Sequence, residues 1–349
     1  MQARQGKTNT IPVHDPARSM ADAQMPMLAL ALDPVHMGRA LREQVESPGG
    51  PLTGTAWELK AIHVRRHKPG RRCLIEYELA DGASARCFSL LGKIRAKGLD
   101  RRSYQVQQAM WQNGFDSAGP DGISVPEPLG LLPQLAMWLQ EKVGAEPILK
   151  GLVGKNGPAL AEQIAEALHK LQRLGPVPEQ THSMADELRI LETQLRAVIH
   201  KQPAWENRIE TLLAACIQLG NSLPPGPPGP SQRDCYHDNI LFDGSRIFLV
   251  DLDLYCLADP GLDPGNCIAH LIDYSLRSQG DPSGLSTIEE TFAARFAALT
   301  GHAHTQQVGV YTTLSLARLV AVSTRIPGRE QWTVRLMDLC EHRIKELHP

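Results

Sequence analysis

The segment 234–253 constrains the fold of this chain more than any other part of the sequence. Two apolar runs, Ile240–Phe242 and Phe248–Val250, flank an Asp-Gly-Ser sequence. An Asp-Gly pair between apolar runs is a strong signal for a β-hairpin. A hairpin turns the chain back on itself, so we expect Asp251, which closes the second strand, to lie beside Asn239, which precedes the first.

Asp234 completes a pattern that is typical of phosphoryl transfer. An Asp, an Asn five residues later and a second Asp at the end of a hairpin have the spacing of a kinase catalytic loop and its metal-binding aspartate. The Asp234 carboxylate can orient a substrate hydroxyl and accept its proton, while Asn239 and Asp251 offer oxygen ligands suited to Mg²⁺. Asp and Asn are also common turn residues, so a plain hairpin is the alternative interpretation. The combination of all these parts favours kinase-type chemistry.

Composition narrows the class of protein. A chain of 349 residues can form two cores, and 42% hydrophobic with 21% charged residues is typical of a soluble globular protein. The net charge of −2 predicts no nucleic-acid partner. Seven scattered cysteines without a Cys-x-x-Cys pair are typical of a reducing cytoplasm. No apolar run is long enough to predict a membrane segment, and the oligomeric state has no signature in the sequence.

The first half of the chain is expected to contain a leader and a small α+β unit. Residues 1–30 are polar and without periodicity, which predicts a disordered leader. Strand-like alternation then surrounds one helix, a pattern typical of an antiparallel sheet. The expected strands are Leu59–Val64, Cys73–Leu79, Arg86–Lys93 and Ala136–Val143, and the expected helix is Asp100–Asn113.

The second half is expected to be mainly helical. Apolar residues recur at helical spacing along most of it. The segment 224–230 contains too many prolines for a helix or a central strand and is interpreted as a stiff connector. The expected helices are Ala159–Leu174, Ala185–Ile199, Ala204–Leu219, Pro264–Arg277, Ile288–Leu299, Val308–Thr324 and Gln331–Leu347.

These features together resemble the aminoglycoside phosphotransferase/choline kinase family of protein-kinase-like small-molecule kinases. The resemblance covers about Thr55 to His348, and its most specific parts are Asp234–Asn239, Val250–Pro260 and Asp263–Asn266. The lack of an Ala-Pro-Glu motif after Asp251 speaks against a protein kinase.

The resemblance implies an α+β, protein-kinase-like fold of two lobes. Residues 31–142 would form a small nucleotide-binding N-lobe on an antiparallel sheet. Residues 143–349 would form a mainly helical C-lobe that carries the catalytic loop and the acceptor site. ATP and Mg²⁺ would then be the cofactors.

The resemblance also assigns roles to individual residues. Asp234 matches the catalytic aspartate, and Asn239 and Asp251 match the Mg²⁺ ligands. Asp253 matches a position for a metal-bound water or the acceptor, although an ordinary solvated strand-end Asp is an equal alternative. Lys93 matches the lysine that reaches the α- and β-phosphates, with a solvated strand end as the alternative.

The nucleotide site implied by the resemblance has two further parts. Arg71 lies in the basic loop 65–72, which takes the place of the nucleotide-covering loop and contains a single glycine. A solvated hairpin tip is the alternative for this loop. Gln140, Glu141 and Val143 match the hinge, where backbone groups would pair with adenine.

The sequence departs from the family pattern in two further places. Gln232 stands two residues before Asp234, where the family usually has His. The helix Asp100–Asn113 has no Glu in its body to pair with Lys93. The glutamines that remain as substitutes are Gln105, Gln107 and Gln108.

The expected activity is ATP-dependent transfer of the γ-phosphate to a hydroxyl of a small polar molecule. The acceptor is not defined by the sequence, so an amino alcohol, a sugar and an aminoglycoside all stay open. The departures leave one alternative from another class, a catalytically weak or inactive kinase-like scaffold that binds nucleotide.

Overall fold

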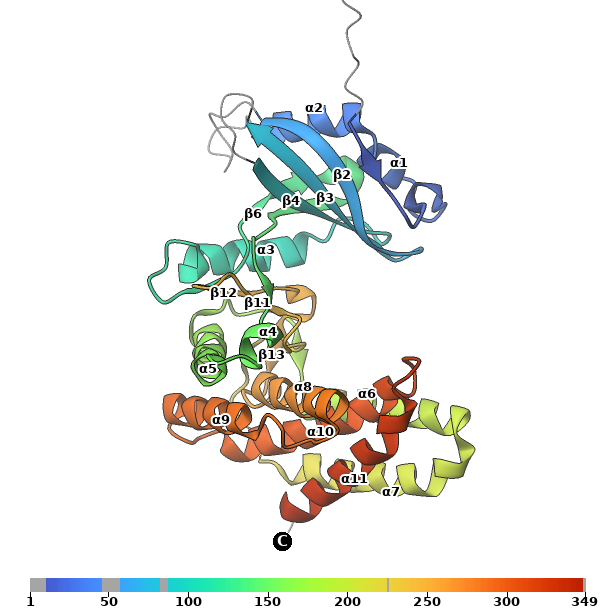
Figure 1. Cartoon of the computed structure of the whole chain (residues 1–349), viewed down its shortest axis with the longest axis vertical. Coiled ribbons are helices and arrows are strands. Elements are labelled where there is room, and N and C mark those ends of the chain that lie inside the picture. Colours follow the sequence, from blue (N-terminus) through green and yellow to red (C-terminus); the bar gives the residue numbers. More distant parts are fainter. Residues whose placement is uncertain (1–10, 46–56, 82–86, 225, 348–349) are drawn as a thin grey trace, which may run out of the picture. The chain divides into compact units, whose positions relative to one another are not determined.

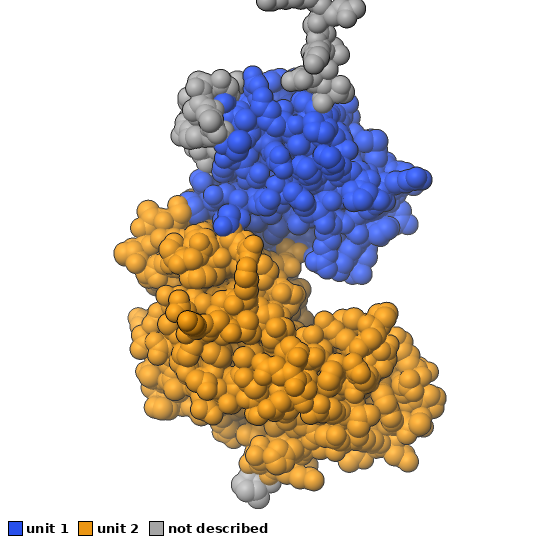
Figure 2. Space-filling model, in the orientation of Figure 1, with its two compact units in different colours: residues 1–111, 126–144 blue, residues 112–125, 145–349 orange. Residues whose placement is uncertain are grey.

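The chain divides into two compact units that mix helices with mostly antiparallel sheets (Figures 1 and 2). Unit 1 is residues 1–111 with 126–144, and unit 2 is residues 112–125 with 145–349. The computed structural model describes the chain in four ranges, which are 11–45, 57–81, 87–224 and 226–347.

Unit 1 is built on a six-stranded sheet in the order β1-β2-β3-β4-β7-β6. Every neighbouring pair is antiparallel except β1 with β2. The four strands expected from residue alternation are therefore confirmed as β2, β3, β4 and β7. The bounds are Val13–His14 for β1, Trp57–Lys68 for β2, Arg72–Asp81 for β3, Cys87–Arg95 for β4, Pro128–Leu132 for β6 and Met137–Glu141 for β7.

The expected helix of unit 1 is present as α3, Arg101–Met110. It begins where Asp100 caps it, because the Asp100 side chain accepts a hydrogen bond from the backbone N–H of Ser103 (3.1 Å). The helical path continues as a distorted turn, Trp111–Phe115, and ends at Gly114, which has φ = 85°. A residue without Cβ adopts this left-handed backbone most easily, so the helical path ends one residue after the expected end at Asn113.

The expected disordered leader is wrong for residues 11–30. The chain there forms β1 and the helix α1, Leu28–Ala31, followed by α2, Pro34–Val45. Met25 and Leu28 are fully buried in the core of unit 1. The polar composition hid this packing because only a few apolar side chains carry it, each contributing about 1.5–3 kcal/mol when buried. Residues 1–10 lie outside the described residues, so the leader stays a prediction there.

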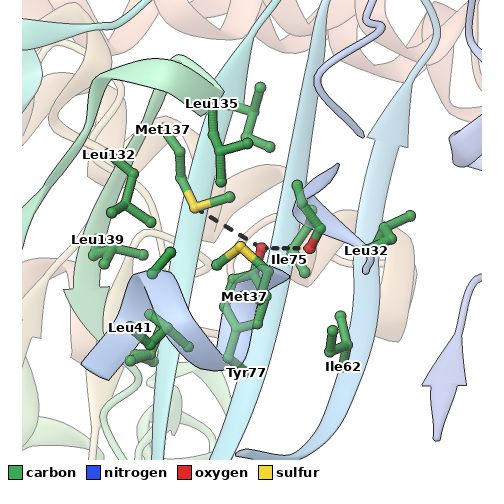
Figure 3. Close-up of a cluster of buried hydrophobic side chains, with 14 of the residues drawn as sticks. Leu32, Met37, Leu41, Ile62, Ile75, Tyr77, Leu132, Leu135, Met137 and Leu139 are labelled. Carbon is green, nitrogen blue, oxygen red and sulfur yellow. Dashed lines mark hydrogen bonds between the residues drawn. The ribbon is translucent and has the colours of Figure 1, made fainter. Parts of the chain in front are cut away.

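The core of unit 1 centres on Tyr77 of β3, which Figure 3 shows beneath Met37 and beside Met137. The Tyr77 hydroxyl donates a hydrogen bond to the carbonyl of Ala31 at 2.9 Å. Gly92 of β4 makes room for this packing, since a Cβ there would come within 2.6 Å of Met137 Sδ. The hydroxyl of Tyr77 thus ties the N-terminal segment to the sheet.

Unit 2 contains the seven expected helices, each within a few residues of its predicted bounds. The helix α10 lies at the centre and packs against α8, α11 and α6. No helix in the described ranges is long and apolar enough to cross a membrane. The bounds are Leu149–Leu152 for α4, Gly157–Leu174 for α5, Met184–Lys201 for α6, Glu206–Ser222 for α7, Leu262–Gln279 for α8, Ser286–Thr300 for α9, Thr305–Ser323 for α10 and Glu330–Leu347 for α11.

Unit 2 also contains two small sheets, β10-β13-β9 and β5-β12-β11-β8, and the segment 234–253 supplies β11 and β12 of the second. The predicted hairpin is confirmed as β11 and β12, with Leu241 opposite Phe248 and the turn glycine at φ = 102°. The end of the Pro-rich connector forms β10, an edge strand, as a proline-containing strand must be. The bounds are Ile123–Ser124 for β5, Glu146–Pro147 for β8, Thr181–His182 for β9, Gly229–Ser231 for β10, Ile240–Phe242 for β11, Ile247–Leu249 for β12 and Cys256–Ala258 for β13.

The substitution Tyr77→Phe tests whether the N-terminal segment is an integral part of unit 1. It leaves the Ala31 carbonyl without its buried donor, so we expect the free energy of unfolding to fall by about 1–2 kcal/mol. Chemical denaturation measures this change. Tyr104→Phe is the matched control, because the Tyr104 hydroxyl only accepts a long 3.4 Å bond from Gln108. Equal effects of the two substitutions would contradict the assignment.

Candidate active site

The loop 234–239 joins β10 to β11 and brings Asp234 and Asn239 together. The Asn239 Nδ2 donates to the Asp234 carbonyl at 2.9 Å and lies 3.5 Å from the Asp234 Oδ2. The backbone N–H of Asn239 donates to the Tyr236 carbonyl at 2.9 Å. The amide N–H₂ thus stabilises the loop, and no hydrogen bond within the described ranges reaches the Asn239 Oδ1. This oxygen remains available as a ligand.

Asp251 follows β12 and returns to the same loop, as the hairpin predicted. The backbone N–H of Val250 donates to the Asn239 carbonyl at 3.1 Å, which ties the end of the hairpin to its beginning. Asp251 has φ = 59°, a left-handed conformation that Asp adopts more readily than most residues. Strained residues of this kind cluster at functional sites.

The charges of Asp234 and Asp251 lie close enough to influence each other. Burial raises the pKa of the half-buried Asp234 carboxyl, and the charge of Asp251 raises it further, whereas Arg318 lowers it. The carboxylates of Asp234 and Asp251 repel each other, and the Asn239 Oδ1 accepts no hydrogen bond in the described ranges. These three oxygen donors fit a divalent cation.

Asp263 at the first turn of α8 holds the chain that leads into Asp234. Its carboxylate accepts hydrogen bonds from the backbone N–H groups of Gln232 and Arg233, both at 2.7 Å. Arg233 has φ = 70°, so the two bonds fix a strained turn immediately before Asp234. Burial raises the pKa of Asp263 to about 6.

The Gln232 side chain bridges the loop 234–239 and the end of the hairpin. Its Nε2 donates to the Val250 carbonyl at 2.5 Å and lies 3.5 Å from the Asn239 carbonyl. The side chain therefore links the strand that carries Asp251 to the loop that carries Asn239. The Gln232 Oε1 is buried and has no hydrogen-bond partner among the described residues.

In unit 1, Lys93 and the hinge lie on neighbouring strands. The Lys93 ammonium lies 4.6 Å from the centroid of the Trp138 ring, within cation–π range. The Gln140 side chain is buried beside Gln107 of α3, whose Nε2 is 3.5 Å from the Gln140 Oε1 and donates to the Pro126 carbonyl at 2.7 Å. Gln107, one of the three candidate glutamines, thus bonds to the hinge side chain.

Backbone hydrogen bonds already use some of the N–H groups of the predicted hinge. The N–H of Glu141 donates to the Glu127 carbonyl at 2.8 Å, and the N–H of Lys142 donates to the Ser89 carbonyl at 3.0 Å. Within the described ranges the N–H of Val143 has no acceptor. Among the predicted hinge positions, Val143 therefore offers the free backbone donor.

The expected basic loop 65–72 is mostly strand, because β2 extends to Lys68 and β3 begins at Arg72, which leaves residues 69–71 as the turn. The segment is held by acidic residues that the sequence did not reveal. Arg65 Nε pairs with the buried Glu76 at 2.5 Å. One Asp22 oxygen lies 2.9 Å from His67 Nε2 and accepts from the Gly70 N–H at 2.8 Å. Arg71, in the turn, is exposed and has no ion pair among the described residues, and the same is true of Arg66 near the end of β2. No signal in the sequence pointed to Asp22, since it reaches the loop only through the fold.

Comparison with known proteins identifies the family of the chain. Residues 101–306, more than half of the chain, match the phosphotransferase enzyme family. The chain therefore belongs to this family and is a small-molecule kinase. No curated protein matches the chain.

Solved structures share the fold at low sequence identity. A candidate aminoglycoside phosphotransferase from Ralstonia eutropha JMP134 has 12% identity and a TM-score of 0.63, over 90% of this chain and 98% of that one. Choline kinase from Cryptosporidium parvum Iowa II has 13% identity and a TM-score of 0.59, over 90% and 96%. A thermostable mutant of aminoglycoside phosphotransferase APH(4)-Ia, in a ternary complex with ADP and hygromycin B, has 12% identity and a TM-score of 0.54, over 88% and 97%.

The substitution Asp263→Asn tests the support of the catalytic loop. An amide keeps one acceptor oxygen but turns an N–H₂ toward a backbone N–H, so one buried donor loses its partner. We expect the free energy of unfolding to fall by about 1–3 kcal/mol, measured by chemical denaturation. Asp281→Asn is the control, because Asp281 also accepts from backbone but is exposed. If the Asp263 variant were no less stable than this control, the loop would not depend on Asp263.

Proposed function

We propose that this small-molecule kinase transfers the γ-phosphate of ATP to a hydroxyl of a small polar molecule. The observation that carries the proposal is the meeting of Asp234, Asn239 and Asp251 at one loop and hairpin. Amino alcohols, sugars and aminoglycosides are the acceptor classes that we consider. The complex of a structural relative with ADP and hygromycin B supports a nucleotide donor and a small acceptor.

In this proposal Asp234 is the catalytic residue. Its carboxylate orients the acceptor hydroxyl and takes its proton as the phosphoryl group arrives. The bonds from Asn239 to the loop and the raised pKa of Asp234 both support a preorganised, partly desolvated base.

Asn239 and Asp251 would hold Mg²⁺ through Asn239 Oδ1 and the Asp251 carboxylate. When bound, the cation would offset the charge of the phosphates and the repulsion between Asp234 and Asp251. Asp251 has a left-handed backbone. Its carboxylate makes no hydrogen bond within the described ranges, which leaves it available for this role. Asp253 stays an alternative position for a metal-bound water or the acceptor.

The nucleotide would be bound by residues of unit 1. Lys93 and Arg71 supply the cations for the phosphates. The Val143 N–H and the backbone of Glu141 would pair with the base, and the buried Gln140 would keep this segment in place. We thus propose a two-lobed kinase, with unit 1 as the nucleotide lobe and unit 2 as the acceptor lobe. The seven free cysteines suit a cytoplasmic protein.

One observation favours the alternative, a nucleotide-binding scaffold with weak or no catalysis. Gln232 replaces an imidazole and leaves a buried oxygen without a partner among the described residues, which costs stability at the catalytic loop. Turnover of Mg-ATP with and without candidate acceptors separates the two functions.

Asp234→Asn tests the catalytic assignment. The amide cannot accept the hydroxyl proton, so we expect turnover to fall by about three orders of magnitude or more while Mg-ATP binding persists. Steady-state kinetics and calorimetry measure the two properties. Asp238→Asn is the matched control in the same loop, because the Asp238 side chain is exposed. Near-normal turnover of the Asp234 variant would refute the role.

Asp251→Asn tests the metal site without disturbing the backbone, since Asn adopts a left-handed conformation as readily as Asp. Loss of one charged oxygen ligand should weaken Mg²⁺-dependent binding of a non-hydrolysable ATP analogue by about tenfold or more, or about 1.4 kcal/mol. Thermal shift titration with and without Mg²⁺ gives the affinity. An unchanged Mg²⁺ dependence would show that Asp251 is not a ligand.

A further inference from the structure

A buried ion pair of unit 2 lies behind the catalytic loop. The Glu187 carboxylate of α6 is only 2% exposed and accepts from two groups. His182 Nε2 lies 2.9 Å from one oxygen, and Arg318 Nη1 of α10 lies 3.2 Å from the other. Burial alone would raise the pKa of Glu187, but the bond with His182 and the charge of Arg318 keep it below its usual value.

The same arginine reaches toward the loop. The second terminal nitrogen of Arg318, Nη2, donates to the Asn266 Oδ1. Asn266 lies in α8, has no exposed surface, and donates through Nδ2 to the Cys235 carbonyl at 2.8 Å. Because Arg318 can only donate, it fixes which end of the Asn266 amide faces the loop.

We propose that Arg318 is a positioning residue for phosphoryl transfer, which it serves by orienting Asn266 to hold the Cys235 carbonyl. That carbonyl belongs to Cys235, the residue immediately after Asp234, so its hydrogen bond restrains the backbone next to the proposed base. The kinetic part of this inference rests on the proposed function. The structural part, restraint of the loop, does not.

The chemistry of the contacts explains why an arginine occupies this position. A guanidinium has a planar fork that donates to Glu187 with one nitrogen and to Asn266 with another. A lysine at the same place has one compact ammonium and cannot span both acceptors in that geometry. Glu187 balances the buried charge of Arg318, which would otherwise be costly.

A purely structural brace is the competing account. Glu187 and Arg318 join two helices that are 131 residues apart in sequence, so their pairing contributes to the fold in any case. The two accounts differ at Asn266. Asn266→Asp keeps an acceptor for Arg318 and even adds a charge, but it removes the donor to the Cys235 carbonyl.

The experiment compares Arg318→Lys and Asn266→Asp with the wild-type protein. Arg295→Lys is the control, because Arg295 pairs with Glu166 on the surface of the same unit. Hydrogen–deuterium exchange of the Asn239 amide, which bonds to the Tyr236 carbonyl, reports opening of the loop. Steady-state hydrolysis of Mg-ATP gives kcat and KM, and thermal denaturation gives Tm.

We expect both variants, but not the control, to exchange the Asn239 amide about tenfold faster and to lose about tenfold in kcat, which is about 1.4 kcal/mol of barrier. The KM for Mg-ATP should stay within about twofold, because no nucleotide-binding residue changes. Asn266→Asp should also lower Tm, because the Cys235 carbonyl loses its buried donor, so amide exchange and kcat are the deciding measurements.

Two results would overturn the inference. One is wild-type exchange of the Asn239 amide in both variants. The other is a loss of Tm in Arg318→Lys together with normal exchange and kcat in Asn266→Asp, which would identify a structural brace. If the wild-type protein turned over no Mg-ATP with any of the candidate acceptors, the proposed function would fail, while the exchange measurement would still decide whether Arg318 restrains the loop.

Discussion

The site depends first on the buried carboxylate of Asp263. It accepts two backbone N–H groups from the turn that precedes Asp234, and a strained turn persists only where such bonds over-determine it. Gln232 then links this turn to the end of β12, so Asp251 is placed relative to the loop by the same residues. The candidate metal ligands and the candidate base are thus set by one small network of backbone contacts.

The structure gives the departure at Gln232 a physical meaning. The side-chain amide still donates across to the Val250 carbonyl, which is the link that an imidazole N–H would provide. Gln232 differs from a histidine in its Oε1, which is buried and has no hydrogen-bond partner in the described part of the chain. A histidine would not bring this oxygen, so the substitution keeps the bridge at the expense of an unsatisfied acceptor.

Local patterns predicted the elements that are defined by local physics. The hairpin β11–β12 follows from an Asp-Gly pair between apolar runs, and α3 was expected over Asp100–Asn113, where the structure adds the cap at Asp100. The N-terminal helices were missed because their burial depends on a sheet formed by later residues, as the contact of Ala31 with Tyr77 illustrates. The proximity of Asp234, Asn239 and Asp251 could be predicted from their spacing around the hairpin. Their support by Arg318 could not, since the helices it joins are far apart in sequence.

The central claim is that this chain moves a phosphoryl group from ATP to a small hydroxyl compound. The most direct measurement incubates the full chain with Mg²⁺, ATP labelled at the γ-phosphate and pools of amino alcohols, sugars and aminoglycosides, and identifies labelled products by mass spectrometry. The account predicts a labelled phosphate ester in at least one pool, formed only with Mg²⁺. Tight binding of Mg-ATP with no labelled ester in any pool would contradict it and favour the nucleotide-binding scaffold.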